Sequence, residues 1–159
     1  MNIYTYDRER ALEYCSKWAL GRNPRYYDFE KLGGDCTNFL SQCLFAGCNV
    51  MNETSETGWY YYSLSSRAPA WTGVNEFYNF LVNNEGLGPF CELGFYNTVS
   101  PADFIQLGNS NRFYHGVIVT KIENGQIYTA SHTRDTYNKR LTDYRFERIR
   151  FLRVKGYRK

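Results

Sequence analysis

No stretch of the sequence is long and apolar enough to cross a bilayer, which would take about 20 consecutive apolar residues. The first ten residues carry four charges and no apolar segment, so the pattern of a secretory signal peptide is absent as well. These absences exclude a membrane-spanning protein. We therefore expect a chain that is cytoplasmic as written, and extracellular or at the cell wall if it is one domain of a longer secreted protein.

The cysteines lack the spacing of a metal site or of a disulfide framework. There are five of them, an odd number, so at least one thiol stays unpaired within the chain. No CxxC pair occurs, and no metal-ligand spacing joins the cysteines to His115 or His132, the only two histidines. We expect no metal ion and no other cofactor.

The chain also lacks internal repeats, low-complexity tracts and linkers. Its 159 residues, 43% hydrophobic and 22% charged, have the composition of one globular domain spanning residues 1–159. Aromatic residues are abundant, at 18%. Because tyrosine is amphipathic, some of these rings are expected to line a surface groove while most of them pack the core.

Basic residues gather at the C-terminal end. Residues 145–159 contain seven arginines and lysines and one glutamate, whereas the rest of the chain is slightly acidic. Such a segment can meet an anionic polymer, but its polar and apolar residues alternate on both sides of Phe151 and Leu152. This pattern predicts a half-buried strand with a solvated basic face and a bulge at those two residues. We expect no nucleic-acid partner.

Apolar periodicity predicts helices in the first half of the chain and strands in the second. Helical spacing covers residues 6–20, residues 74–82 and a segment with Asp35 as N-cap that ends near Gly47. A long connection spans residues 49–72. Strand patterns follow at residues 103–107, 116–122 and 126–131, and Asn124–Gly125 forms a hairpin turn between the last two. Helices followed by an antiparallel sheet describe an α+β domain.

Cys36 differs from the other cysteines in its surroundings. It follows Gly33, Gly34 and Asp35 and occupies the first turn of the second predicted helix. Backbone N–H groups and the helix dipole favour an anion at that position, so we expect a lowered thiol pKa. The N–H group of the residue itself can also stabilise an oxyanion. Cys36 is therefore the candidate nucleophile.

A nucleophilic cysteine needs a base, and the two histidines are the candidates. His115 opens the first strand of the predicted hairpin and His132 ends the second. Pairing about the turn places His115 near Arg134 and within reach of His132, at one end of the sheet. One histidine would act as the base, and the other, or Asp135 beside it, would orient the base.

The segment from Gly34 to Leu44, GDCTNFLSQCL, resembles the nucleophile motif of the putative amidase domain family of Gram-positive bacteria. That family is similar to the NlpC/P60 and CHAP groups of papain-like cysteine hydrolases. The resemblance runs in order along nearly the whole chain. It includes Trp18–Ala19, Asn23–Pro24, Gly58–Trp59–Tyr60, Ala70–Trp71–Thr72, 103–106, His115 and 131–135.

The resemblance implies a papain-like α+β fold in which N-terminal helices pack on an antiparallel sheet and the nucleophile begins a helix. It also implies hydrolysis of amide bonds, with peptidoglycan stem peptides or cross-links as the expected substrate. Carried over by position, Cys36 is the nucleophile, His115 is the general base and His132 is the orienting group. Asp135 is the reserve for that last role.

Aromatic side chains of the long connection would complete the site. Those expected to line the substrate groove are Trp59, Tyr60, Tyr61 and Trp71. The alternative is that Trp59 and Trp71 anchor the connection to the core. Asp103 matches a Gly-Asp pair of the family, but Ala102 stands where the family has glycine, and we expect a structural role for Asp103.

Two other functions stay open. A binding module can keep this fold without its chemistry and hold glycan through an aromatic groove and a basic tail, although the Cys–His–His set counts against it. Another thiol chemistry, such as acyl transfer or hydrolysis of an intracellular amide, agrees with the absent signal peptide. The expected partner is a peptide or a peptidoglycan-like polymer, and the sequence does not predict an oligomeric state.

Overall fold

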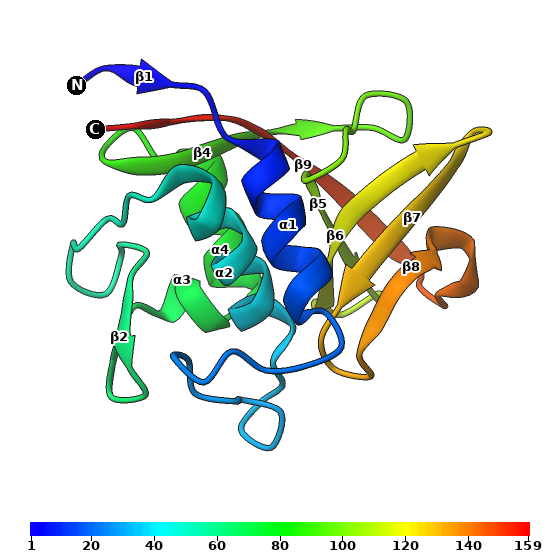
Figure 1. The fold of residues 1–159 in the computed structure, drawn as a ribbon, viewed down its shortest axis with the longest axis horizontal. Helices are drawn as coiled ribbons and strands as arrows, with labels where there is room; N and C mark the ends of the chain where they lie inside the picture. Colours follow the sequence, from blue (N-terminus) through cyan, green and yellow to red (C-terminus); the bar gives the residue numbers. More distant parts are fainter.

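A computed structural model describes all 159 residues, with helices packed on one face of an antiparallel sheet (Figure 1). The sheet order is β1 (Ile3–Tyr4), β9 (Arg148–Arg158), β5 (Phe104–Gly108), β6 (Phe113–Glu123), β7 (Gln126–Ser131) and β8 (Thr136–Arg140). Strand β4 (Gly88–Gly94) also pairs with β9, and β2 (Tyr61–Ser63) with β3 (Ser66–Arg67) forms a separate hairpin. The α+β class and the antiparallel sheet are confirmed.

The three helices predicted from periodicity are present as α1 (Arg8–Trp18), α2 (Cys36–Cys48) and α4 (Val74–Asn83). Helix α1 begins after Asp7, whose carboxylate accepts the N–H group of Arg10 at 3.0 Å, as expected of an N-cap. The single-turn helix α3 (Pro69–Thr72) was not predicted because four residues carry no period. No helix reaches the length and apolarity needed to span a membrane.

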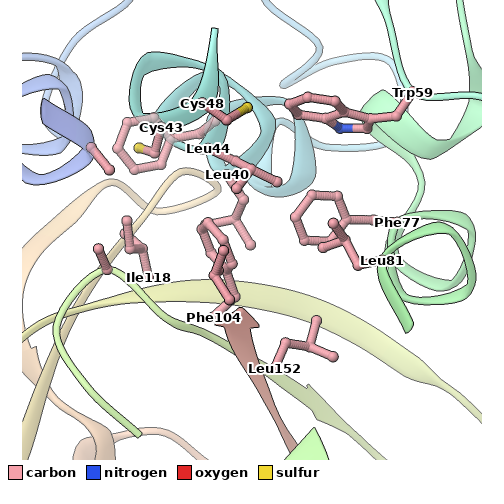
Figure 2. Packing of buried hydrophobic residues seen from close by; sticks show 14 of the residues in the cluster. Leu40, Cys43, Leu44, Cys48, Trp59, Phe77, Leu81, Phe104, Ile118 and Leu152 are labelled. Carbon is pink, nitrogen blue, oxygen red and sulfur yellow. The ribbon is translucent and has the colours of Figure 1, made fainter. Parts of the chain in front are cut away.

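Helix α2 is the centre of the core. Eleven of its 13 residues are buried, and Figure 2 shows Leu40 lying above Phe104 of the sheet. A Cβ atom on Gly116 of β6 would come within 2.7 Å of Leu40 Cδ1, so glycine allows the helix to approach that strand closely. Burial on nearly every side fixes the helix axis, and with it the position of its first residue, Cys36.

The bulge expected at Phe151–Leu152 is absent, although the predicted C-terminal strand is confirmed as β9. Both residues continue the regular ladder with β5. Leu152 belongs to the helix-side core, the apolar cluster between the helices and the sheet that includes Leu40 and Phe104. Phe151 belongs to a second apolar cluster, which includes Val117. Because both faces of the sheet are covered here, adjacent apolar residues need no bulge. The extra residue of β9 is Lys155, opposite β4.

Candidate active site

The Cys36 thiol lies against strand β6. Its sulfur lies 3.9 Å from Thr37 Oγ1, and the nearby backbone N–H group of Gly116 favours the thiolate. Burial raises the pKa of the Cys36 thiol, the negative charge of Asp35 adds to the increase, and the hydrogen bonds from Gly116 and Thr37 oppose it. The expected lowering of this pKa is wrong, because desolvation outweighs the donors at the helix start. The thiol rests protonated at neutral pH.

The N–H group that reaches the thiol has no strand partner. The N–H group of Val119 donates to the carbonyl oxygen of Asp103, on the β5 side of β6. Because successive N–H groups along a strand point to alternate sides, the N–H group of Gly116, three residues earlier, points toward β7. Strand β7 ends at Ser131, one residue before it would lie opposite Gly116. The Cys36 sulfur thus lies near a backbone donor for which strand β7 provides no carbonyl oxygen.

His115 is next to Gly116 in sequence but faces the other side of the sheet. Since the missing Cβ of Gly116 points at α2, strand alternation turns His115 away from the helix. Its ring lies 5.8 Å from the ring of Tyr144, between centroids. Burial lowers the pKa of His115 to about 4, and the positive charge of Lys139 acts in the same direction. The imidazole is therefore neutral at pH 7, and no hydrogen bond joins it to Cys36.

A cavity of about 450 Å³ opens beside His115. It is lined by His115, Tyr114, Thr133, Arg134, Lys139, Asp143, Tyr144 and Arg145. The hydroxyl oxygen of Thr133 accepts the N–H group of Asp35 at 3.2 Å. The cavity thus reaches a residue in contact with the backbone that immediately precedes Cys36.

His132 is buried and has both ring nitrogens engaged. Nδ1 lies 2.5 Å from Asp35 Oδ2, Nε2 lies 2.9 Å from the carbonyl oxygen of Trp18, and the ring stacks on Phe39. Both ring nitrogens are thus engaged within the chain, and neither is left to bond His115. The expectation that His132 orients His115 is not supported. His132 instead joins the end of β7 to α1 and to the start of α2.

Asp135 is held by Arg22 in a two-pronged ion pair, with nitrogen–oxygen distances of 2.7 and 3.1 Å. Because the Asp135 carboxylate is bound to Arg22, nothing in the structure supports the alternative expectation that Asp135 orients His115. Asp35 occupies the N-cap position of α2, but its carboxylate bonds no helix N–H group. It accepts instead from Phe29 N–H at 2.8 Å and from the Asn38 side chain at 2.9 Å. Asp35 therefore ties the preceding loop and His132 to the helix start.

A bulge explains why the two histidines face opposite sides of the sheet. The pairs next to the hairpin turn keep the predicted register, but one extra residue, Thr120, shifts every pair beyond it, beginning with Val119 and Thr129. A slip of one residue exchanges the two faces of a strand. His115 and His132 lie at the same end of the sheet, as predicted, yet they do not meet.

The aromatic residues of the long connection are mostly structural. Trp59 and Trp71 are fully buried, with ring centroids 4.7 Å apart. The Trp59 indole donates to Ser41 and the Trp71 indole to Asn38, both on α2 and both at 3.0 Å. Neither tryptophan can line a substrate groove, so that expectation is wrong and the anchoring alternative holds. None of the expected groove residues lines the cavity beside His115.

Tyr61 is 7% exposed and borders a different cavity of about 400 Å³ with Phe45 and Asn49. Those two residues lie at the C-terminal end of α2, roughly 13 Å (Phe45) and roughly 20 Å (Asn49) along the helix from Cys36. Tyr60 is half-buried. Tyr61 is therefore not placed at the thiol.

Three residues near the thiol and His115 were not predicted: Gly116, Thr133 and Lys139. A signal was present for Gly116, since glycine inside an apolar strand often marks the close approach of another backbone. Thr133 and Lys139 carry no such signal, because their positions depend on the turn between β7 and β8.

A family model described as "Putative amidase domain" matches residues 5–153 of the chain. An uncharacterized protein of Bacillus subtilis (strain 168), YhbB, is 29% identical to it over 148 residues. The aligned region covers 91% of this chain and 46% of YhbB, so the chain spans about half the length of that relative. No solved structure matches the chain.

Proposed function

The chain belongs to the putative amidase domain family, and we propose that it is a cysteine amidase in which Cys36 attacks the carbonyl carbon of an amide bond. The observation that carries the proposal is the position of this thiol at the first turn of a buried helix, beside backbone donors. The N–H group of Cys36 itself has no hydrogen-bond partner. The other four cysteines are packed in the helix-side core.

His115 is the proposed base. Its ring nitrogens have no protein partner, and its lowered pKa keeps a lone pair available at neutral pH. Because the thiol and the imidazole are both uncharged at rest, proton transfer accompanies the attack instead of preceding it. The two groups share no hydrogen bond, so we propose that one water molecule, entering from the cavity that reaches Thr133, relays the proton.

The proposed reaction then proceeds in two halves. The Cys36 sulfur forms a bond to the carbonyl carbon, His115 receives the thiol proton, and the oxyanion is stabilised by the N–H groups of Cys36 and Gly116. Protonated His115 returns its proton to the leaving amine, which departs and leaves a thioester. His115 next takes a proton from water and the resulting hydroxide attacks the thioester carbon. The C–S bond breaks, the carboxylic acid departs, and protonated His115 returns its proton to the Cys36 sulfur, which restores the thiol and the neutral imidazole.

A papain-like arrangement is part of the proposal. It is supported by a cysteine at the start of a helix that packs against an antiparallel sheet carrying the histidine. The family suggests a peptide-like substrate. We propose the stem peptides or cross-links of peptidoglycan, which would require the chain to act outside the cytoplasm as part of a longer exported protein.

Incubation with a panel of amides tests this function. Purified peptidoglycan and soluble peptide amides should release new amino groups, detected by amine labelling and mass spectrometry. Prior alkylation of Cys36 should stop the release. Saturable binding to peptidoglycan with no release from any member of the panel would instead identify a binding module. Release from the soluble amides alone would favour an intracellular amide as the substrate.

A further inference from the structure

The cavity beside His115 is cationic. Arg134, Lys139 and Arg145 border it, and none of the three forms an ion pair within the chain. The one acidic residue in the lining, Asp143, is already paired with Arg140 at 3.3 Å. Three uncompensated positive charges therefore surround a volume of about 450 Å³ whose inner wall carries a neutral histidine.

These charges come from separate segments that the fold brings together. Arg134 lies in the turn between β7 and β8, Lys139 is on β8, and Arg145 follows the short 3-10 helix at Leu141–Asp143. The Lys139 ammonium lies 4.1 Å from the centre of the Tyr144 ring, which keeps the charge on the cavity side of the strand.

Backbone strain at the same turn supports a role for the cavity. Thr133 and Arg134 both have positive φ angles, 65° and 60°. A β-branched residue rarely adopts this conformation, and such strain persists only where the surroundings enforce it. Here it directs the Thr133 hydroxyl to Asp35 N–H and presents Arg134 at the cavity mouth.

A separate cluster of charges around Arg22 has the opposite sign. Four carboxylates, those of Asp28, Glu30, Asp35 and Asp135, surround the single guanidinium of Arg22. This cluster carries more negative than positive charge, whereas the cavity beside His115 carries the excess of positive charge that attracts an anion.

We propose that this cavity is a subsite for an anionic group of the substrate, a carboxylate or a phosphate, held by Arg134, Lys139 and Arg145 next to His115. The inference rests on the proposed amidase function and narrows it to amides that carry a negative charge close to the scissile bond. A peptide with a free carboxylate fits this description, and the same peptide with that group amidated does not.

Binding of small anions to the folded protein tests the subsite without any turnover. The long-range proton–nitrogen NMR spectrum of the two imidazoles is recorded at constant ionic strength during titration with glutarate, inorganic phosphate or neutral glutaramide. The His115 signals should shift saturably with an anion, whereas glutaramide should leave them unchanged and the His132 signals should not move. Tighter binding of glutarate identifies a carboxylate subsite, and tighter binding of phosphate identifies a phosphate subsite.

Charge-removing variants complete the test. Lys139→Gln and Arg134→Gln should each raise the anion dissociation constant about tenfold, as expected for the loss of one charge-assisted contact. Lys31→Gln, at an exposed lysine without an ion pair, should leave it unchanged. Thermal unfolding of each variant checks that the fold is intact. Absence of a saturable shift, equal binding of glutaramide, or equal loss in the control would overturn the subsite.

The two proposals fail separately. If the protein binds anions but cleaves no amide, the proposed subsite stands and the proposed amidase function is rejected. If Cys36 cleaves the charged and the amidated peptides at equal rates, the proposed amidase function stands and the proposed subsite is rejected.

Discussion

Replacing Cys36 with alanine should lower the rate of amide hydrolysis by a factor of about 10³ or more, because removal of a nucleophile leaves only substrate binding and oxyanion stabilisation. The matched variant Cys48→Ala, at the other end of the same helix, should keep the rate within a few-fold. Both side chains are buried, at 7% and 3% exposure, so the two changes disturb packing to a similar degree. Initial rates on the amide that gives the most amine, with circular dichroism as the folding check, provide the comparison.

The reason for the difference lies in what surrounds each sulfur. Cys36 contacts the unpaired N–H group of Gly116 on the sheet, whereas Cys48 donates its S–H to the carbonyl oxygen of Val50. Only the first environment can stabilise negative charge that develops on sulfur or on an adjacent oxyanion. A Cys36→Ala protein that retains the wild-type rate would remove Cys36 from the mechanism.

Replacing His132 with alanine should lower the free energy of unfolding by about 3–5 kcal/mol, because it leaves the carboxylate of Asp35 buried without its imidazole partner. For a chain of this length, the melting temperature should fall by roughly 10 °C. The Trp18 carbonyl oxygen would also lose its donor. Thermal and urea unfolding measure the change, and any loss of activity at low temperature should be smaller than the loss caused by Cys36→Ala.

A double-mutant cycle separates this structural role from a catalytic one. Adding Asp35→Asn to His132→Ala should recover part of the lost stability, because the buried charge is then gone. The Asp135→Asn variant breaks a more exposed ion pair with Arg22 and should cost about 1 kcal/mol or less. Unchanged stability of His132→Ala together with a large fall in kcat would assign His132 to catalysis after all.

The sequence predicts the elements that leave a clear local pattern, either a long run of apolar residues or a distinctive turn. Helix α2 is predicted because its apolar residues continue over 13 positions, and the hairpin of β6 and β7 because Asn124–Gly125 selects the turn. Strand β8 escapes notice because its residues, Thr136–Arg140, are all polar or aromatic, as suits a sheet edge. Strand β4 carries Pro89 and two glycines, which hide its pairing with β9.

The sequence predicts which elements carry Cys36, His115 and His132 but not how these side chains face one another. Cys36 stands out because it follows two glycines and begins a helix, and both features are local. The orientation of His115 depends on the bulge at Thr120, and no pattern in the sequence predicts a bulge at that position. The engagement of His132 with Asp35 depends on a contact between residues 97 positions apart.

Alkylation of Cys36 by iodoacetamide as a function of pH, with mass-spectrometric site assignment in the wild type and in His115→Gln, measures the charge state of the proposed pair. An uncharged thiol beside an uncharged imidazole predicts a Cys36 pKa above the ordinary value of about 8.5, and the same value in both proteins. A pKa well below that value in the wild type, rising when His115 is replaced, would contradict the neutral pair and establish a preformed thiolate–imidazolium pair instead.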